Sequence, residues 1–232
     1  MFRVKICGIT SVEDARVVAE AGADAVGLNF YARSQRCVPI GRAQAIAGSL
    51  PAGVVKVGLF VNAPAGEVCA TFDRVGLDLI QLHGDELPSF LRQLGGRPVV
   101  KAFRLRGPGD LSTIGRYLAE CRGMKCVPQM TLVDAFVEGA YGGTGQLADW
   151  QALTPHRPHG PETPIPPVVL AGGLTPDNVA EAIRTVRPAA VDTASGVESA
   201  PGRKDRASVE RFVQAARRAF EHLGGSAPSI FP

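Results

Sequence analysis

Hydrophobic residues along the chain form two alternating patterns: short apolar runs of β type and longer segments with helical spacing. The short runs predict eight strands, at Phe2–Ile6, Ala25–Asn29, Val54–Phe60, Leu77–Leu82, Val99–Phe103, Met130–Asp134, Val168–Ala171 and Ala189–Asp192. A helical pattern follows each of them, at Val12–Ala21, Arg42–Leu50, Ala65–Val75, Pro88–Leu94, Leu111–Cys121, Leu147–Leu153, Asp177–Val186 and Val209–Leu223. Because every predicted strand is followed by a helix, we expect parallel strands joined by crossover helices.

Eight strand–helix units in strict order favour one architecture. Eight strands close a parallel sheet into a (β/α)8 TIM barrel, and 232 residues can form one such domain. A doubly wound open sheet is the competing α/β fold, but it usually has fewer strands, and the GxGxxG turn expected after its first strand is missing. The sequence therefore predicts a single TIM barrel domain over residues 1–223.

Two segments interrupt this alternation. Residues 155–167 contain six prolines, which exclude regular structure, so we expect an extended surface insertion before the seventh strand. Residues 224–232 are predicted to form a short, frayed C-terminal tail.

Several helix boundaries carry clear signals. Thr10 or Ser11 is expected to cap the first helix, and Gly22 to close it. Near the seventh strand, Thr175 is the expected N-cap, with Pro176 at the first helical position.

Composition and charge narrow the class of protein. The chain is 45% hydrophobic and 20% charged, which fits a globular domain, and its formal charge of +3 is dispersed, with no basic run interleaved with aromatic residues. We therefore expect no nucleic-acid partner. No apolar run reaches the roughly 18 residues of a membrane helix, and no signal peptide is evident. The odd set of five cysteines predicts free thiols in a reducing compartment, hence a cytoplasmic protein.

Polar residues at the predicted strand ends locate the candidate chemistry. In a TIM barrel the active site lies at the carboxyl ends of the strands. The polar groups there are Cys7, Asn29, His83, Arg104, Asp134 and Asp192. Since side chains alternate along a strand, Cys7, His83 and Asp134 can all point into the same barrel mouth.

Glycines follow the last two strands. Gly172 and Gly173 follow the seventh strand, and Ser195 and Gly196 lie in the loop after the eighth. Glycines allow backbone N–H groups to approach an oxyanion, and these two loops are the recurring phosphate site of TIM barrels. The alternative is that the glycines only make tight turns. The glycine-rich stretch at 142–145 is expected to be a loop that closes over substrate.

Taken together, the motifs resemble those of the phosphoribosylanthranilate isomerase family of tryptophan biosynthesis. The resemblance runs from residue 5 to residue 205, in the family's order. The segments that carry it are Lys5-Ile6-Cys7-Gly8-Ile9-Thr10, Gln81-Leu82-His83-Gly84-Asp85-Glu86, Gly142-Gly143-Thr144-Gly145, the stretch Leu170-Ala171-Gly172-Gly173-Leu174-Thr175-Pro176-Asp177-Asn178-Val179, Ser195-Gly196-Val197-Glu198 and Gly202-Arg203-Lys204-Asp205. The sequence departs from the family's pattern in two places. The proline-rich insertion is longer than the family usually carries, and the residues Asp192-Thr193-Ala194 differ slightly from the usual ones.

The resemblance implies an acid–base Amadori rearrangement of N-(5′-phosphoribosyl)anthranilate. It implies Cys7 as general base and Asp134 as general acid, with no metal or organic cofactor, because the substrate's imine nitrogen accepts the electrons. Arg36 matches the arginine that binds the anthranilate carboxylate, and His83 would line the pocket. We expect a small phosphosugar substrate, no membrane contact, and a monomer or homodimer.

Other readings of the same residues stay open. The related isomerase of histidine biosynthesis resembles this chain in fold but pairs two aspartates, against which Cys7 argues. Cys7 could instead be a covalent nucleophile, with His83 as its base. A non-catalytic phosphosugar-binding barrel would keep the glycine loops without needing both Cys7 and Asp134. Each residue also has a structural alternative: Cys7 as a small buried apolar group, Asp134 as a loop cap, His83 as a hydrogen-bonded structural imidazole and Arg36 as a solvated charge.

Overall fold

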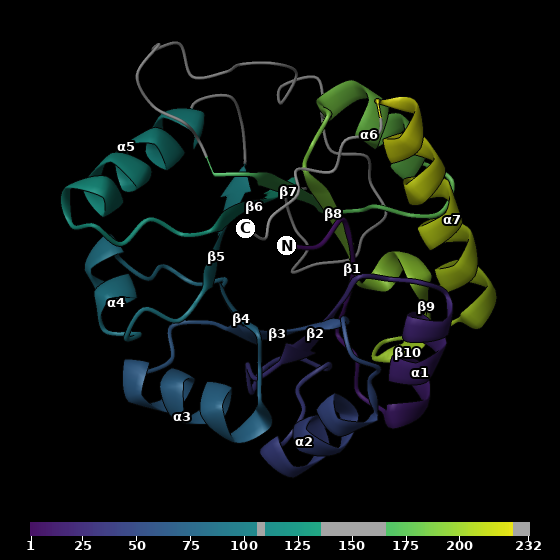
Figure 1. Ribbon diagram of the computed structural model, residues 1–232, viewed down its shortest axis with the longest axis horizontal. Helices are drawn as coiled ribbons and strands as arrows, with labels where there is room; N and C mark the ends of the chain where they lie inside the picture. Colours follow the sequence, from purple (N-terminus) through teal and green to yellow (C-terminus); the bar gives the residue numbers. More distant parts are fainter. Residues whose placement is uncertain (106–109, 136–165, 225–232) are drawn as a thin grey trace.

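The computed structural model describes residues 1–105, 110–135 and 166–224, and these form a closed barrel of eight parallel strands surrounded by helices (Figure 1). The predicted α/β TIM barrel is therefore confirmed. The strands are β1 (Val4–Cys7), β2 (Ala25–Asn29), β3 (Val55–Phe60), β4 (Leu79–Leu82), β5 (Val99–Leu105), β6 (Met130–Ala135), β7 (Val168–Ala171) and β8 (Ala190–Thr193).

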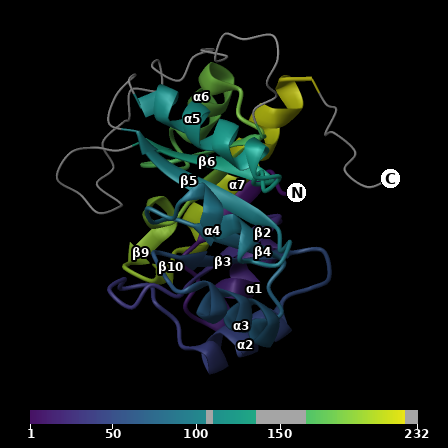
Figure 2. The ribbon, with the colours of Figure 1, turned by 90° about the vertical axis from the view of Figure 1, so that its left-hand side faces the viewer.

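Helices follow the strands and form the outer layer. They are α1 (Val12–Glu20), α2 (Ile40–Ser49), α3 (Ala65–Val75), α4 (Pro88–Arg92), α5 (Asp110–Gly123), α6 (Val179–Val186) and α7 (Arg206–His222). Between β8 and α7 lie the 3-10 helix η2 (Ser195–Val197) and an antiparallel hairpin of β9 (Glu198–Ala200) and β10 (Arg203–Lys204). In the side view this hairpin lies at the opposite end of the barrel from the N-terminus (Figure 2).

Some predictions fall outside the described residues. These are the helix at Leu147–Leu153, the glycine-rich loop at 142–145, and the insertion at 155–167 except for its last two residues. The domain limits of 1–223 and 224–232 therefore stay predictions.

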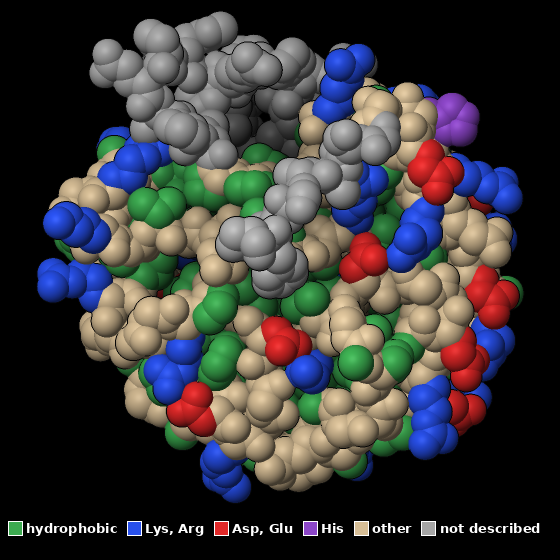
Figure 3. Space-filling model, in the orientation of Figure 1, with side chains coloured by type: hydrophobic (Ala, Val, Ile, Leu, Met, Phe, Trp, Pro, Cys, Tyr) green, Lys and Arg blue, Asp and Glu red, His purple; other side chains and the backbone are tan. Residues whose placement is uncertain are grey.

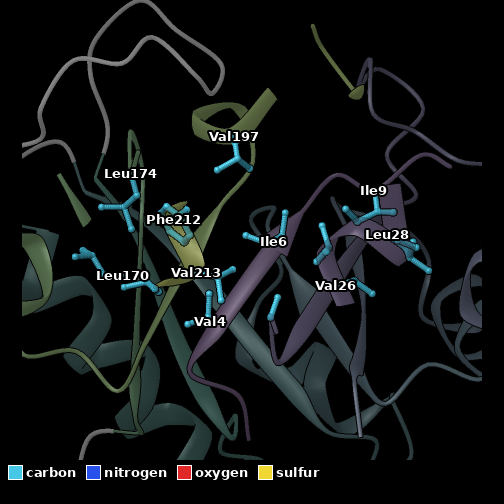
Figure 4. Packing of buried hydrophobic residues seen from close by; sticks show 14 of the residues in the cluster. Val4, Ile6, Ile9, Val26, Leu28, Leu170, Leu174, Val197, Phe212 and Val213 are labelled. Atoms are coloured by element: carbon cyan, nitrogen blue, oxygen red, sulfur yellow. The ribbon is translucent and has the colours of Figure 1, made fainter. Parts of the chain in front are cut away.

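Alternation along the strands sorts the apolar residues into two layers. Val4 and Ile6 of β1 face outward and join the cluster between barrel and helices, together with Phe212 and Val213 of α7 (Figure 4). A second cluster fills the barrel interior, with Phe2, Ala25, Val57, Leu79, Val100, Ala102, Met130, Leu132, Val169, Ala171 and Ala190. Burying both layers is the main favourable term in folding, and it fixes which strand residues point into the barrel.

The helix-end predictions gave mixed outcomes. Ser11 caps α1 by accepting a hydrogen bond from the backbone N–H of Asp14 at 3.0 Å, and Gly22 follows the helix in the left-handed region with φ of +87°. The predicted cap at Thr175 is wrong. Asn178 is the N-cap of α6, and its side-chain oxygen accepts the backbone N–H of Thr175 at 2.8 Å, so the proline lies in a turn before the helix.

Charged residues of both signs are mixed on the face in Figure 3. They alternate along the side where α1 and α7 lie in Figure 1, where Arg206 pairs with Glu20 and Arg217 with Asp24. Exposed pairs of this kind contribute about 0–1 kcal/mol each. None of the helices in the described part of the chain is both long and apolar enough to span a membrane.

Truncating the fully buried Phe212 tests the outer layer. We expect Phe212→Ala to lower the free energy of unfolding by about 3–5 kcal/mol, because it leaves a cavity between α7 and the barrel. The matched control is Gln214→Ala on the exposed face of the same helix, with an expected change within about 0.5 kcal/mol. Urea unfolding followed by circular dichroism measures both, and equal shifts would contradict the layer assignment.

Candidate active site

Cys7 is the last residue of β1, and the backbone turns immediately after it. Gly8 takes a left-handed φ of +75°, and the N–H groups of Gly8 and Ile9 both donate to the carbonyl of Gly27, at 2.9 and 3.0 Å. Gly27 lies beside Cys7 in the β1–β2 register, and a Cβ at Gly27 would lie 2.6 Å from the Cys7 sulfur. The glycine on the neighbouring strand therefore leaves the space that the thiol occupies.

A buried ion pair lies beside the thiol. Lys5 points into the barrel two residues before Cys7, and its Nζ lies 2.8 Å from Oδ2 of Asp192 on the adjacent strand β8. Burial alone would lower the pKa of Lys5, but its interactions with Asp192 and Cys7 together more than offset this and raise the pKa. Lys5 is therefore a fixed positive charge next to Cys7.

Burial raises the pKa of the Cys7 thiol, and the positive charges of Lys5 and Lys204 oppose this shift only in part. The sulfur is thus protonated over a wider pH range than an exposed thiol. The ease with which it forms a thiolate therefore depends on the charges around it.

His83 and Asp134 meet across the barrel mouth, as the strand alternation predicted. His83 Nε2 lies 3.5 Å from Asp134 Oδ2, and both side chains are only partly exposed. The side-chain nitrogen of Gln81 lies 3.1 Å from His83 Nδ1. With that amide N–H directed at Nδ1, the imidazole carries its proton on Nε2, the nitrogen that faces Asp134.

The two glycine-bearing loops contact each other. Gly172 and Gly173 have φ of +92° and +64°, and the hydroxyl of Thr193 donates to the carbonyl of Leu174 at 2.7 Å. A Cβ at Gly196 would collide with that same carbonyl, so only glycine fits there. Ser195 and Gly196 begin η2, and the first N–H groups of a helix have no partner inside it. The loops can therefore present backbone donors to one anion.

Arg36 is held by a partner that the sequence reasoning did not identify. Its Nε and Nη2 donate to the two carboxylate oxygens of Glu198, at 2.8 and 2.6 Å. These contacts raise the pKa of Arg36; burial alone would raise that of Glu198, but Arg36 and Lys204 hold it below its ordinary value. Arg36 is thus a paired charge, which excludes the reading of it as a solvated loop residue.

The structure brings most of the predicted residues to one end of the barrel but shows roles that were missed. Asp192 was noted only for its position, and Lys5, Glu198 and Lys204 only as parts of motifs. Gly27 was missed, although a glycine inside a strand is a signal of close approach by another group.

The nucleophile alternative loses its base in this arrangement. His83 interacts with Gln81 and Asp134, and no histidine hydrogen-bonds the Cys7 sulfur within the ranges that the structure describes. In the same ranges, no group of three or more His, Cys, Asp or Glu residues is arranged to hold a metal ion.

Comparisons with known proteins give consistent matches. The family model described as N-(5′-phosphoribosyl)anthranilate (PRA) isomerase matches residues 4–215. Relatives named N-(5′-phosphoribosyl)anthranilate isomerase from Rubrobacter xylanophilus and Geobacter sulfurreducens are each 48% identical, covering 94% of this chain and 100% and 99% of their own.

Solved structures match over the same range. The phosphoribosyl anthranilate isomerase of Thermotoga maritima is 37% identical with a TM-score of 0.82, covering 94% of this chain and all of its own. A phosphoribosyl anthranilate isomerase in complex with reduced 1-(o-carboxyphenylamino)-1-deoxyribulose 5-phosphate matches at 37% identity and a TM-score of 0.79, with the same coverage.

Thiol labelling tests the electrostatics around Cys7. We expect the inflection in the rate of Cys7 alkylation by iodoacetamide to lie above about 8.5, the ordinary thiol pKa, because burial raises the pKa of Cys7. Lys5→Met should move the inflection to higher pH, since it removes a charge that favours the thiolate. Peptide mass spectrometry measures the rate at Cys7 alone.

The double variant Lys5→Met/Asp192→Asn is the control. It also removes the carboxylate that disfavours the thiolate, so its shift should be smaller than that of Lys5→Met. A shift to lower pH in Lys5→Met would contradict this account of the site.

Proposed function

From the premise that the chain belongs to the N-(5′-phosphoribosyl)anthranilate isomerase family, we propose that Cys7 and Asp134 are the general base and general acid of its reaction. The protein is an isomerase of tryptophan biosynthesis, which converts N-(5′-phosphoribosyl)anthranilate to 1-(2-carboxyphenylamino)-1-deoxyribulose 5-phosphate by an Amadori rearrangement. The observation that best supports the assignment is that a thiol, a carboxyl group and two glycine-bearing loops lie at the carboxyl ends of β1, β6, β7 and β8.

The chemistry begins with two proton transfers, and each has a suitable group. Asp134 protonates the furanose ring oxygen, so the ring opens to an iminium ion. Cys7 then removes the C2′ proton, and the electron pair moves to the iminium nitrogen, which makes a metal or organic cofactor unnecessary. The resulting enolamine becomes the ketone product when C1′ gains a proton and the C2′ hydroxyl loses one. General acid–base catalysis of this kind contributes about 10²–10⁴-fold in rate.

His83 supports the acid from the end of β4, which is separated from β6 by β5. Its Nε2–H faces the Asp134 carboxyl group at 3.5 Å and can orient it toward the substrate. In this role His83 lines the pocket, as the sequence predicted, without transferring a proton itself.

The substrate's two anionic groups have separate binding positions in this proposal. The backbone N–H groups around Gly172, Gly173, Ser195 and Gly196 bind the phosphate. Arg36 binds the anthranilate carboxylate with the edge of its guanidinium that Glu198 does not occupy.

We also propose a cytoplasmic location, supported by five free cysteines, and a monomeric or homodimeric state. One related structure is described as monomers derived from the dimeric isomerase of Thermotoga maritima. The isomerase of histidine biosynthesis stays the alternative activity, but no feature of this site favours it over the reaction assigned here.

Removing either proton-transfer group tests the acid–base pair. Cys7→Ala and Asp134→Asn should each lower kcat by at least about 10²-fold while the affinity for ribose 5-phosphate stays within about twofold. Loss of the fluorescent substrate measures turnover, and inhibition measures phosphate affinity. Substantial activity in either variant would remove that residue from the mechanism.

Two binding-site variants should show opposite ligand selectivity. Arg36→Ala should weaken anthranilate-containing ligands by at least about tenfold and leave ribose 5-phosphate nearly unchanged. Gly196→Ala should weaken ribose 5-phosphate and leave anthranilate, which carries no phosphate, nearly unchanged, because its Cβ would displace the Leu174 carbonyl.

The matched control for Gly196→Ala is Gly66→Ala on α3, where a Cβ meets no atom within 4 Å. Titration of each variant with both ligands makes the comparison, and equal weakening of the two ligands would count against the assigned positions.

A further inference from the structure

A buried lysine, Lys204, connects three parts of the site that are far apart in sequence. Its Nζ donates to the carbonyl of Cys7 at 2.7 Å, to the carbonyl of Ala194 at 3.0 Å and to Glu198 Oε1 at 2.8 Å. An ammonium has three protons, and each has one acceptor here. The side chain has no exposed surface, so water does not compete for these contacts.

Glu198 extends this connection to Arg36. Its Oε1 accepts from both Lys204 Nζ and Arg36 Nε, and its Oε2 accepts from Arg36 Nη2. The fork-to-fork geometry fixes the plane of the guanidinium as well as its position. One guanidinium edge, formed by Nη1 and the second N–H of Nη2, is left for another carboxylate.

The stem of Arg36 lies against the turn that follows Cys7. A Cβ at Gly8 would collide with the Arg36 Cδ. Gly8 therefore permits the arginine to pass next to the proposed base, and the two groups are connected on one side by this packing and on the other by Lys204 and Glu198.

We propose that Glu198 and Lys204 are positioning residues for the reaction, which fix the guanidinium of Arg36 relative to Cys7. This inference rests on the proposed roles of Cys7 and Arg36. Neither residue needs to touch the substrate: Glu198 orients Arg36, and Lys204 holds Glu198, the end of β1 and the residue before η2 in one arrangement.

Burial of an ion pair carries a desolvation penalty, and an apolar pair of similar volume is often as stable. Anchoring the β9–β10 hairpin alone would therefore not require these charges. Directional contacts to two carbonyls and a guanidinium do require them, which favours a positioning role over a purely structural one.

The test is a double-mutant cycle between Glu198 and Arg36. Glu198→Gln should raise KM for N-(5′-phosphoribosyl)anthranilate at least about tenfold and leave the inhibition constant of ribose 5-phosphate within about twofold. In the Arg36→Ala background the same substitution should have less than about a twofold further effect on KM. Additive effects in the cycle would overturn the proposal.

Glu86 supplies a matched control. Its Oε2 lies 3.0 Å from Lys101 Nζ, both side chains are buried, and neither contacts Arg36. Glu86→Gln removes a comparable buried carboxylate, and its effect on KM should be additive with that of Arg36→Ala. If Glu198→Gln does not fold, Glu198→Asp is the second variant. It keeps the charge but shortens the side chain, and we expect the same rise in KM with an unchanged inhibition constant of ribose 5-phosphate.

Lys204→Met provides an independent readout at Cys7. The inflection of Cys7 alkylation should move to higher pH, because a charge that favours the thiolate is lost. An unchanged inflection would contradict the connection from Lys204 to Cys7. If Arg36→Ala alone leaves KM unchanged, both the proposed function of Arg36 and this inference are overturned. If Arg36→Ala raises KM selectively for the anthranilate-containing substrate but its effect is additive with that of Glu198→Gln, only the inference is overturned.

Discussion

The seam between β1 and β8, where the barrel closes, is the contact on which the site depends. Its register pairs Lys5 with Asp192, and it brings Cys7 near the residues that follow β8. A one-residue shift would turn the side chains of β1 to the opposite face and remove Cys7 from the mouth. The ion pair between Lys5 and Asp192 forms in this register, so the contact between β1 and β8 supplies both the closure of the fold and the surroundings of the thiol.

Much of the site could be predicted from the sequence because it depends on local patterns. Strand periodicity and the side-chain alternation at β1, β4 and β6 were enough to direct Cys7, His83 and Asp134 toward one end of the barrel. These features need only the order of residues within a strand and the fact that parallel strands end on the same side.

What could not be predicted depends on contacts between distant residues. Arg36 and Glu198 are 162 positions apart, and their pairing follows from the path of the β9–β10 hairpin, for which no periodic signal exists. The cap at Thr175 was misplaced for a related reason. The Asn178 side chain closes a turn onto Thr175, so a local side-chain bond prevailed over the preference of proline for a first helical turn.

The proposed chemistry gives the charges around Cys7 a definite task. In the reactive form of the pair, the single proton is on the carboxyl group of Asp134 and Cys7 is a thiolate. In the alternative form the proton is on the sulfur of Cys7 and Asp134 is a carboxylate. Both forms carry the same number of protons, so their ratio is set by the surroundings and not by pH. Burial favours the protonated sulfur, whereas Lys5 and Lys204 favour the thiolate. Since the charges of Asp192 and Glu198 offset only part of the combined charge of Lys5, Arg36 and Lys204, a positive surplus is left beside the sulfur. The same interactions that fix Arg36 in place thus also increase the population of the reactive form.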